Sequence, residues 1–408
     1  MIILGSVLIL STLRAITLHK ADKRPAVHGF HIMVSKRVAS IRSSGIRDIF
    51  DMAAEGAINL GLGELDFEPP QGARDALGQA CAEGKSKYGP TAGLMALREA
   101  IASHESTRSP SISVKNVLIT AGATEGIMAI CQSLIDPGDE VLVPDPGFVL
   151  YSPEVLLAGA KSVPYRLDET PGFVPDVGAI QESVTSRTRA IFVNSPSNPT
   201  GGVITKEAHR AITEIAVDHD MWIVSDEVYE DFLYDGAEHF SFSGDLDNAI
   251  VVNSFSKSLA VPGWRIGYIL ADESVFKELT KMQYYVIACP PTPIQHAILA
   301  AMPHRAGFMR DILPILDARR RRIVSLLNEI PSFSCNLPRG GFYAFPRYNI
   351  DIPSRRLAER IVGAGVINSP GSAFREAGEG HLRFSYAASE DDIARGMGIV
   401  RSVVEEQE

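Results

Sequence analysis

The sequence predicts an α/β protein with a large, doubly wound, mostly parallel sheet domain and a smaller α+β domain. Between residues 70 and 302, short apolar runs such as VLIT (117–120) and AIVVNSF (249–255) alternate with amphipathic stretches. Because these runs are rich in β-branched residues and lack strict polar alternation, they are typical of parallel strands buried on both faces. After Pro293 the pattern changes to long helical stretches followed by strand-like segments, which indicates a second unit of another kind.

The length of 408 residues favours two domains over one core. We expect the large domain to span 70–302 and the small domain to combine 33–69 with 303–408. Residues 1–32 form an N-terminal extension of doubtful status, for which a weak anchor, a buried arm and a mis-assigned start are the open interpretations. Their apolar start, MIILGSVLIL, has no preceding basic residue and is too short to span a bilayer comfortably, while Met33 opens a conventional segment.

The expected elements follow in chain order. In the large domain, the predicted strands are 117–120, 140–144, 190–194, 222–228, 249–255 and 264–270, with helices at 126–135 and 206–220. Helical patterns also cover 294–302, 312–330, 353–364 and 389–405, and strand-like segments lie at 340–346, 366–374 and 381–387. The segment INLGLGELDF (58–67) is expected to join the small domain.

Composition narrows the class of protein. The net charge of −10 argues against a nucleic-acid-binding surface, and nothing indicates a membrane protein. The four cysteines lie far apart and show neither a CxxC motif nor the spacing of a metal site. We therefore expect no metal and reduced, packed cysteines in a reducing, cytoplasmic compartment. The cysteines are Cys81, Cys131, Cys289 and Cys335.

Polar residues follow the predicted strands, at the sheet edge where ligands bind in such folds. After VLIT comes AGATEG (121–126), whose small residues let a ligand approach the backbone, with a helix starting near Thr124. The N–H groups of the first helical turn suit a phosphate. The alternative is an ordinary turn between a strand and a helix. In SPSNPTGG (195–202), the loop is either rigid and holds the Asn198 amide over a ligand, or it is only a proline-rich connection between elements. Asp226 ends a buried strand and needs a partner, unless it caps a helix.

The stretch SFSKSLAVPGWRIGY (254–268) places Lys257 beside two serines, with Arg265 eight residues further on. Hydroxyls and a guanidinium suit a phosphate, and a lysine shielded from water has a lowered pKa and attacks carbonyls. The alternative is a surface lysine in a salt bridge. A phosphate site, a nucleophilic lysine and a strand-end aspartate together indicate pyridoxal 5′-phosphate, which bonds to lysine and pairs its ring nitrogen with aspartate.

These segments resemble the class I/II aminotransferases, which are fold type I pyridoxal-phosphate-dependent enzymes of the aspartate aminotransferase-like fold. The resemblance runs from about Ile58 to Tyr386, most of the chain. Its markers stand in family order: GELDFEPP, YGPTAG, NSPSNPTG, SDEVY, SFSKSLAVPGWRIGY, GGFYAF, SPGSAF and HLRFSYA.

The resemblance implies a role for each matching residue. Lys257 would carry the cofactor and move a proton, Asp226 would pair with the pyridine nitrogen, and Tyr229 and Asn198 would bond the ring oxygen. The phosphate would be held by Ala123, Thr124, Ser254, Ser256 and Arg265.

The resemblance also implies the surroundings of the cofactor. Phe148 would stack on the ring, unless it only packs in the core. Tyr88 would reach the phosphate of a neighbouring subunit, which makes a homodimer part of the site. Gly63 and Asn198 would line the substrate pocket. Arg383 would bind the substrate α-carboxylate, the alternative being a salt bridge at a strand end.

The implied function is amino transfer from an L-amino acid to a 2-oxo acid by a ping-pong mechanism. Aspartate-preferring relatives carry a second cation where this chain has Thr124 or Tyr284. Tyr284, Tyr285 and Ile287 instead favour apolar, aromatic or broad-range side chains. Two alternatives use the same site: a carbon–sulfur or carbon–carbon lyase, and an aspartate aminotransferase despite the missing cation. A cofactor-binding regulator is disfavoured because only about fifty residues precede Ile58.

Overall fold

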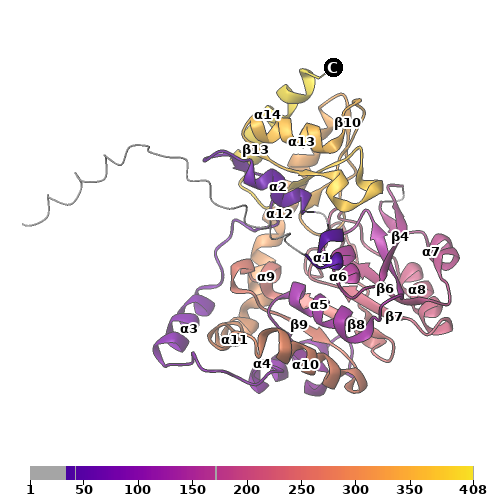
Figure 1. Ribbon diagram of the computed structural model, residues 1–408. Coiled ribbons are helices and arrows are strands. Elements are labelled where there is room, and N and C mark those ends of the chain that lie inside the picture. Colours follow the sequence, from indigo (N-terminus) through magenta and orange to yellow (C-terminus); the bar gives the residue numbers. More distant parts are fainter. Residues whose placement is uncertain (1–33, 42, 171, 408) are drawn as a thin grey trace, which may run out of the picture.

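The computed structural model describes residues 34–41, 43–170 and 172–407 (Figure 1). The proposed extension, 1–32, lies outside these residues. A large sheet unit forms the lower part of Figure 1 and a smaller unit, coloured mainly yellow and orange, lies above it. Among the residues that the structure describes, no helix is both long and apolar enough to cross a membrane.

The large unit is built on an eight-stranded sheet with the order β2-β9-β8-β7-β6-β3-β4-β5. Strands β4, β3, β6, β7 and β8 run parallel, whereas β9 is antiparallel to both of its neighbours and β5 is antiparallel to β4. The strands are β2 (Val117–Thr120), β3 (Glu140–Asp145), β4 (Lys161–Asp168), β5 (Val174–Pro175), β6 (Thr188–Asn194), β7 (Trp222–Asp226), β8 (Ala249–Ser254) and β9 (Gly267–Leu270). The mostly parallel α/β sheet is thus confirmed.

Helices cover both faces of this sheet. On β8, Ile250 and Val252 pack in one apolar cluster while Val251 packs in another, so every side chain of the strand's centre is buried. The first face is covered by α5 (Ala123–Leu134), α6 (Tyr151–Leu157) and α10 (Glu273–Ile287). The second is covered by α3 (Gln71–Ala82), α4 (Met95–Glu105), α7 (Val177–Ser183), α8 (Lys206–Asp218) and α11 (Thr292–Ala301). Burial on both faces explains why the strands lack polar alternation.

The smaller unit contains short strands and three long helices around its own apolar core. β1 (Ile58–Asn59) pairs in parallel with β13 (Val366–Ile367), so the start of the segment at 58–67 packs on this unit. A second sheet has the order β11-β15-β14, and β10 pairs with β12. The remaining bounds are β10 (Phe333–Ser334), β11 (Tyr343–Ala344), β12 (Arg347–Tyr348), β14 (Ser369–Pro370), β15 (Leu382–Ser385), α12 (Arg305–Asn328), α13 (Ser354–Gly363) and α14 (Glu390–Glu405).

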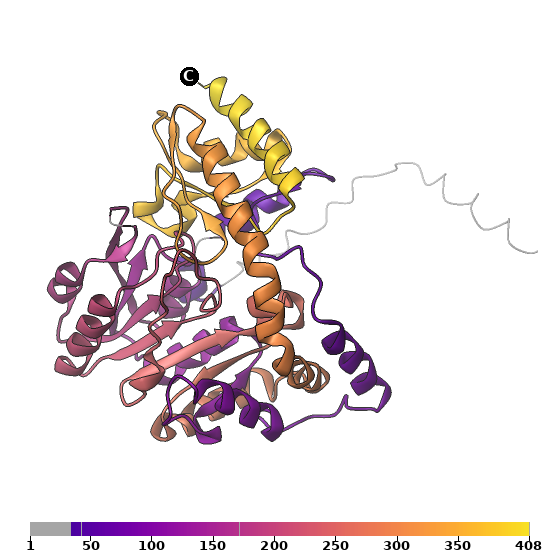
Figure 2. The ribbon, with the colours of Figure 1, turned by 180° about the vertical axis from the view of Figure 1, so that it is seen from behind.

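Contacts cross the predicted domain boundaries. Helix α12 runs from beside the large sheet into the small unit (Figure 2). Phe232 and Tyr234, from the segment after β7, pack in the core of the small unit. Near the N-terminus, α1 (Lys36–Ser40) lies on the large unit, where Arg37 Nη1 donates to Leu157 O at 2.9 Å, and α2 (Gly45–Asp51) lies on the small one. The division at residues 70 and 302 remains a prediction.

Candidate active site

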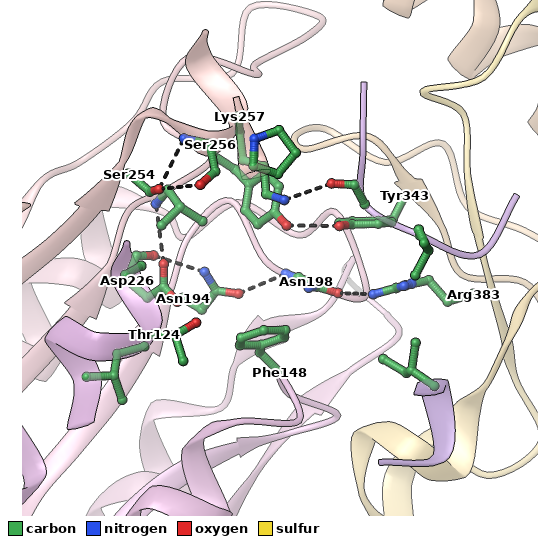
Figure 3. Close-up of a pocket in the computed structure, with 18 of the residues that line it drawn as sticks. Thr124, Phe148, Asn194, Asn198, Asp226, Ser254, Ser256, Lys257, Tyr343 and Arg383 are labelled. Carbon is green, nitrogen blue, oxygen red and sulfur yellow. Dashed lines mark hydrogen bonds between the residues drawn. The ribbon is translucent and has the colours of Figure 1, made fainter. Parts of the chain in front are cut away.

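A cavity of about 240 Å³ opens at the carboxyl ends of β6, β7 and β8. Asn194 and Asp226, the last residues of β6 and β7, are paired in register, and Ser254 ends β8. The cavity brings together every predicted site residue except Tyr88. These residues are Gly63, Ala123, Thr124, Phe148, Asn198, Asp226, Tyr229, Ser254, Ser256, Lys257, Arg265 and Arg383. In Figure 3, Asp226 and Arg383 lie on opposite sides of the space that Lys257 enters, and Phe148 lies across it.

Lys257 lies in the short helix α9 (Phe255–Ser258) directly after β8. The Ser254 hydroxyl caps this turn by accepting from the Ser256 N–H at 3.1 Å. The Lys257 amine donates to the backbone carbonyl of Gly63 at 2.7 Å. Burial lowers the pKa of Lys257 to about 8, against the opposing attraction of Glu64. A substantial fraction of this amine is therefore neutral near pH 7–8 and able to act as a nucleophile.

Asp226 is a buried carboxylate with neutral donors. It accepts from the Tyr151 hydroxyl at 2.7 Å and from the Val228 N–H at 3.3 Å. Burial raises the pKa of Asp226 to about 6, although the Tyr151 hydrogen bond opposes this. In the described chain the next helical element begins only at Phe242, so capping of a helix does not explain Asp226. A buried carboxylate held in this way suits a cationic ligand atom.

The predicted phosphate site combines a helix start with hydroxyls and a guanidinium. Helix α5 begins after Gly122, which has φ 81° and no side-chain cap. The φ of 81° is what favours glycine at position 122, and the absence of a side chain also lets an Arg265 nitrogen come within 2.6 Å of where a Cβ atom would lie. Ser254 and Ser256 are linked at 2.9 Å beside it. Backbone N–H groups, hydroxyls and a cation at one place form an anion site.

Arg383 lies on β15 and is 3% exposed. It donates to Asn198 Oδ1 at 2.9 Å, to Gly61 O at 2.5 Å and to Ser369 Oγ at 3.2 Å. These acceptors are neutral, so the salt-bridge alternative does not describe this residue, and its Nε has no partner among the described residues. Burial lowers the pKa of Arg383. A buried guanidinium without a carboxylate partner is suited to a carboxylate ligand.

Tyr343 and Tyr151 are site residues to which the sequence argument gave no role. The Tyr343 hydroxyl lies 2.9 Å from that of Tyr229. A Cβ atom at Gly63 would lie 1.9 Å from the Tyr343 oxygen, which explains the glycine. Tyr343 was contained in the quoted GGFYAF marker, whereas Tyr151 is found only through its contact with Asp226.

Other residues of the cavity were also not predicted, among them Asn194, Ile46 and Leu62. Asn194 accepts from the Asn198 N–H at 2.8 Å and donates to Asp226 O at 2.9 Å, which ties the two strand ends together. The apolar side chains of Ile46 and Leu62 line the cavity from segments near the N-terminus. Asn194 opens the NSPSNPTG marker, but no local pattern points to Ile46 or Leu62.

Some predicted contributors lie outside their own chain's cavity. Tyr88 is 90% exposed, Tyr284 57% and Tyr285 79%, and neither tyrosine of this α10 pair lines the cavity. The inference that Tyr284 and Tyr285 shape the substrate pocket is therefore wrong within one chain, because α10 turns both outward. The packing interpretation of the cysteines holds for the buried Cys131 and Cys335 and fails for Cys81, which is exposed.

Comparison with known proteins agrees with this geometry. Residues 55–398 match the model of the family "Aminotransferase class I and II". The chain belongs to this family. An aspartate aminotransferase of Pyrococcus horikoshii is 37% identical, with 91% of this chain and 97% of that protein covered. An aromatic-amino-acid aminotransferase of Thermococcus litoralis is 35% identical, with 92% and 99% covered.

Solved structures show the same fold. An aspartate aminotransferase of Thermus thermophilus with maleate superposes with a TM-score of 0.87 at 34% identity, covering 91% of this chain and 99% of that one. The protein is therefore an aminotransferase with the fold of that family, as the resemblance implied.

Proposed function

We propose that this aminotransferase uses pyridoxal 5′-phosphate, bound covalently at Lys257, to exchange an amino group between an L-amino acid and a 2-oxo acid. One observation carries the proposal: a single cavity contains a lysine with a pKa of about 8, a buried carboxylate and a buried guanidinium without an acidic partner. When bound, this cofactor supplies an electron sink that stabilises the charge left on the substrate Cα.

The residues of the cavity fit this cofactor. The start of α5 would hold the phosphate together with Ser254, Ser256 and Arg265, and Asp226 would hold the protonated pyridine nitrogen. Tyr229 and Asn198 would donate to the ring oxygen, and Phe148 would cover one face. Support comes from the uncapped helix start and from the buried Asp226, which accepts only from neutral donors.

The chain's own groups would carry out the remaining steps. Arg383 would give up hydrogen bonds to neutral oxygens and bind the substrate carboxylate instead. This contact would orient the substrate so that its Cα proton points toward Lys257. The Lys257 amine would accept this proton and later return it, because its pKa of about 8 leaves part of the amine neutral. Release of the first oxo acid before the second binds gives ping-pong kinetics.

We propose apolar, aromatic or broad-range amino donors. The cations that line the cavity among the described residues are Lys257, Arg265 and Arg383. With the first two serving the cofactor and Arg383 the α-carboxylate, none remains for an acidic side chain, while Ile46 and Leu62 offer apolar contact. Aspartate stays the second candidate, because the Pyrococcus horikoshii relative of 37% identity is named an aspartate aminotransferase.

We further propose a homodimer in a reducing, cytoplasmic compartment. The exposure of Tyr88 outside its own cavity supports a role in a neighbouring site, and the free thiols are compatible with reducing conditions.

An absorbance titration tests the proposal. Protein incubated with pyridoxal phosphate is expected to show the visible band of the lysine-bound cofactor, and Lys257→Ala to lack it. Addition of single amino acids without any oxo acid should bleach the band and release one equivalent of 2-oxo acid. The amino acid that does so most efficiently identifies the donor. Turnover with ammonia release and no acceptor would establish the lyase alternative, and absence of any band would refute the cofactor assignment.

A further inference from the structure

Arg375 lies just outside the cavity in a backbone conformation that is rare for a residue with a side chain. Its φ is 82° and its ψ is −170°. This region is nearly restricted to glycine, and other residues remain there only where their surroundings hold them. Arg375 belongs to the segment 374–377, which connects the small unit to β3 and β4 of the large sheet. The proposed function gives Arg375 no role.

Polar contacts fasten this segment to the large sheet. The Ala377 N–H donates to Asp145 Oδ1 at 3.0 Å, and Asp145 is the last residue of β3. Arg375 Nε lies 3.9 Å from Asp145 Oδ2, and Arg375 Nη1 donates to the hydroxyls of Ser152 and, at 3.1 Å, Ser162. The guanidinium thus joins α6 and β4 to a segment of the small unit, which explains how the unfavourable backbone conformation is held.

The opposite side of the same segment contacts the substrate site. The buried Phe374 ring lies 4.9 Å from the Arg383 guanidinium carbon. The Phe374 carbonyl accepts from the Gly147 N–H at 3.1 Å, and Gly147 directly precedes Phe148. Segment 374–377 therefore touches two walls of the cavity that come from different units: Arg383 from the small one and the Phe148 loop from the large one.

We propose that Arg375 and Asp145 are positioning residues that set the place of Arg383 relative to Phe148. This inference rests on the proposed function, in which Arg383 binds the substrate carboxylate. Without the Arg375 contacts, only the Ala377–Asp145 and Gly147–Phe374 hydrogen bonds fasten segment 374–377 to the large unit, and this weaker attachment lets Phe374 and Arg383 shift away from their present place relative to Phe148. Misplacement of a binding group by about 1 Å is enough to slow a reaction on the order of a hundredfold.

The test uses the pyridoxal-phosphate-loaded enzyme and L-alanine, whose small side chain adds few contacts of its own. Arg375→Met keeps the Cβ atom and removes the hydrogen bonds, whereas Arg375→Gly removes the hydrogen bonds and also relieves the backbone strain. For both we expect the apparent dissociation constant of L-alanine in the first half-reaction to rise about tenfold. The inhibition constant of propionate should rise by the same factor. The inhibition constant of ethylamine and the dissociation constant of the cofactor should stay unchanged.

Arg356→Met is the matched control, because Arg356 is an exposed arginine of α13 paired with Glu359 at 3.3 Å. It should leave all four constants unchanged. If Arg375 is a positioning residue, Arg375→Gly should lose affinity for L-alanine while its melting temperature falls little. If Arg375 has a purely structural role, the affinity and the melting temperature should fall together. Wild-type constants in both Arg375 variants would overturn the inference, as would equal weakening of propionate, ethylamine and cofactor. A wild-type enzyme that fails to react with any amino acid would instead overturn the proposed function.

Discussion

At the scale of single residues, the site depends on groups whose charge is shifted by burial. The pKa of Lys257 is lowered to about 8 because burial disfavours the ammonium form, and the pKa of Asp226 is raised to about 6 for the corresponding reason. A negative partner would raise the pKa of Lys257 again, and a positive partner would lower the pKa of Asp226 again. The cofactor proposed here supplies the second of these partners through its ring nitrogen.

The shifted lysine predicts a pH dependence of cofactor binding. Only the neutral amine attacks an aldehyde, and the amine is charged below its pKa and neutral above it. The rate at which pyridoxal phosphate joins the cofactor-free protein should therefore rise with pH and level off above about 8. Stopped-flow absorbance between pH 6 and about 10, with N-acetyl-lysine as the unshifted reference of pKa near 10.4, measures this. A rate that still rises tenfold per pH unit at about pH 9 would contradict the lowered pKa.

Residues in local motifs were predicted, and residues that depend on tertiary contacts were not. Asp226 is the last residue of β7, and Lys257 and Asn198 lie three and four residues after the ends of β8 and β6, so the carboxyl ends of the strands bring them together without further knowledge of the fold. Tyr151 reaches Asp226 from a helix 75 positions earlier in the chain, and Ile46 reaches the cavity from a short helix of the other unit. Such contacts depend on how elements pack, which periodicity does not reveal.

At the scale of elements, the apolar strands were predictable, including β2 at one edge of the sheet, whereas β4 and β5 at the other side were not. β8 is buried throughout and appears as an uninterrupted apolar run. β4 lies near the sheet edge and carries Lys161, Pro164 and Arg166, and only Tyr165 and Leu167 on it are fully buried. The strand expected at 264–270 begins later, at Gly267, because a short helical turn precedes Arg265, whose φ is 53°. A strand that is buried on one face only lacks a continuous apolar run, so its sequence pattern is too weak to identify it as a strand.

Helix α12 is anchored to the large unit at its first residue. Arg305 is 4% exposed and donates to Glu230 at 2.7 Å and to Asp231 at 2.6 Å, and its Nη1 lies 3.0 Å from the His104 ring. The far end of the helix packs in the small unit, where Leu327 is fully buried. This ion-pair network therefore links the segment after Asp226 to the helix that supports the small unit.

Removal of the anchor should destabilise the protein strongly. Arg305→Met leaves Asp231 without its cation and Glu230 with only the half-exposed Arg108, so the free energy of unfolding should fall by about 3–5 kcal/mol. Urea denaturation followed by tryptophan fluorescence measures the change. Arg210→Met is the control, since the Arg210–Glu214 pair is exposed and its loss should leave the midpoint unchanged. Equal midpoints for Arg305→Met and wild type would show that the network contributes no net stability.

At the scale of the whole molecule, the proposed homodimer would add Tyr88 to the active site of the neighbouring chain. The described cavity contains no contribution from Tyr88, although the resemblance assigns this residue to a phosphate. Tyr88 and Tyr285 are the most exposed of the large apolar side chains in the described chain. Exposed aromatic side chains of this kind are enriched where a second protein surface binds. A second copy of the chain would bury them and bring Tyr88 to the other subunit's phosphate.

Mixed dimers provide a direct test of this shared site. Lys257→Ala should abolish activity, and Tyr88→Ala should weaken cofactor binding about tenfold through the loss of one hydrogen bond to a charged group. In a dimer of one chain of each variant, one site combines Lys257 from the Tyr88→Ala chain with Tyr88 from the Lys257→Ala chain, so it is fully native. Mixing and reassociating the two variants should therefore restore native cofactor affinity in one site per mixed dimer. If Tyr88 instead served its own chain, every site of the mixture would lack one of the two residues and no native affinity would return. Light scattering of the wild-type protein at the mass of a single chain would exclude the shared site altogether.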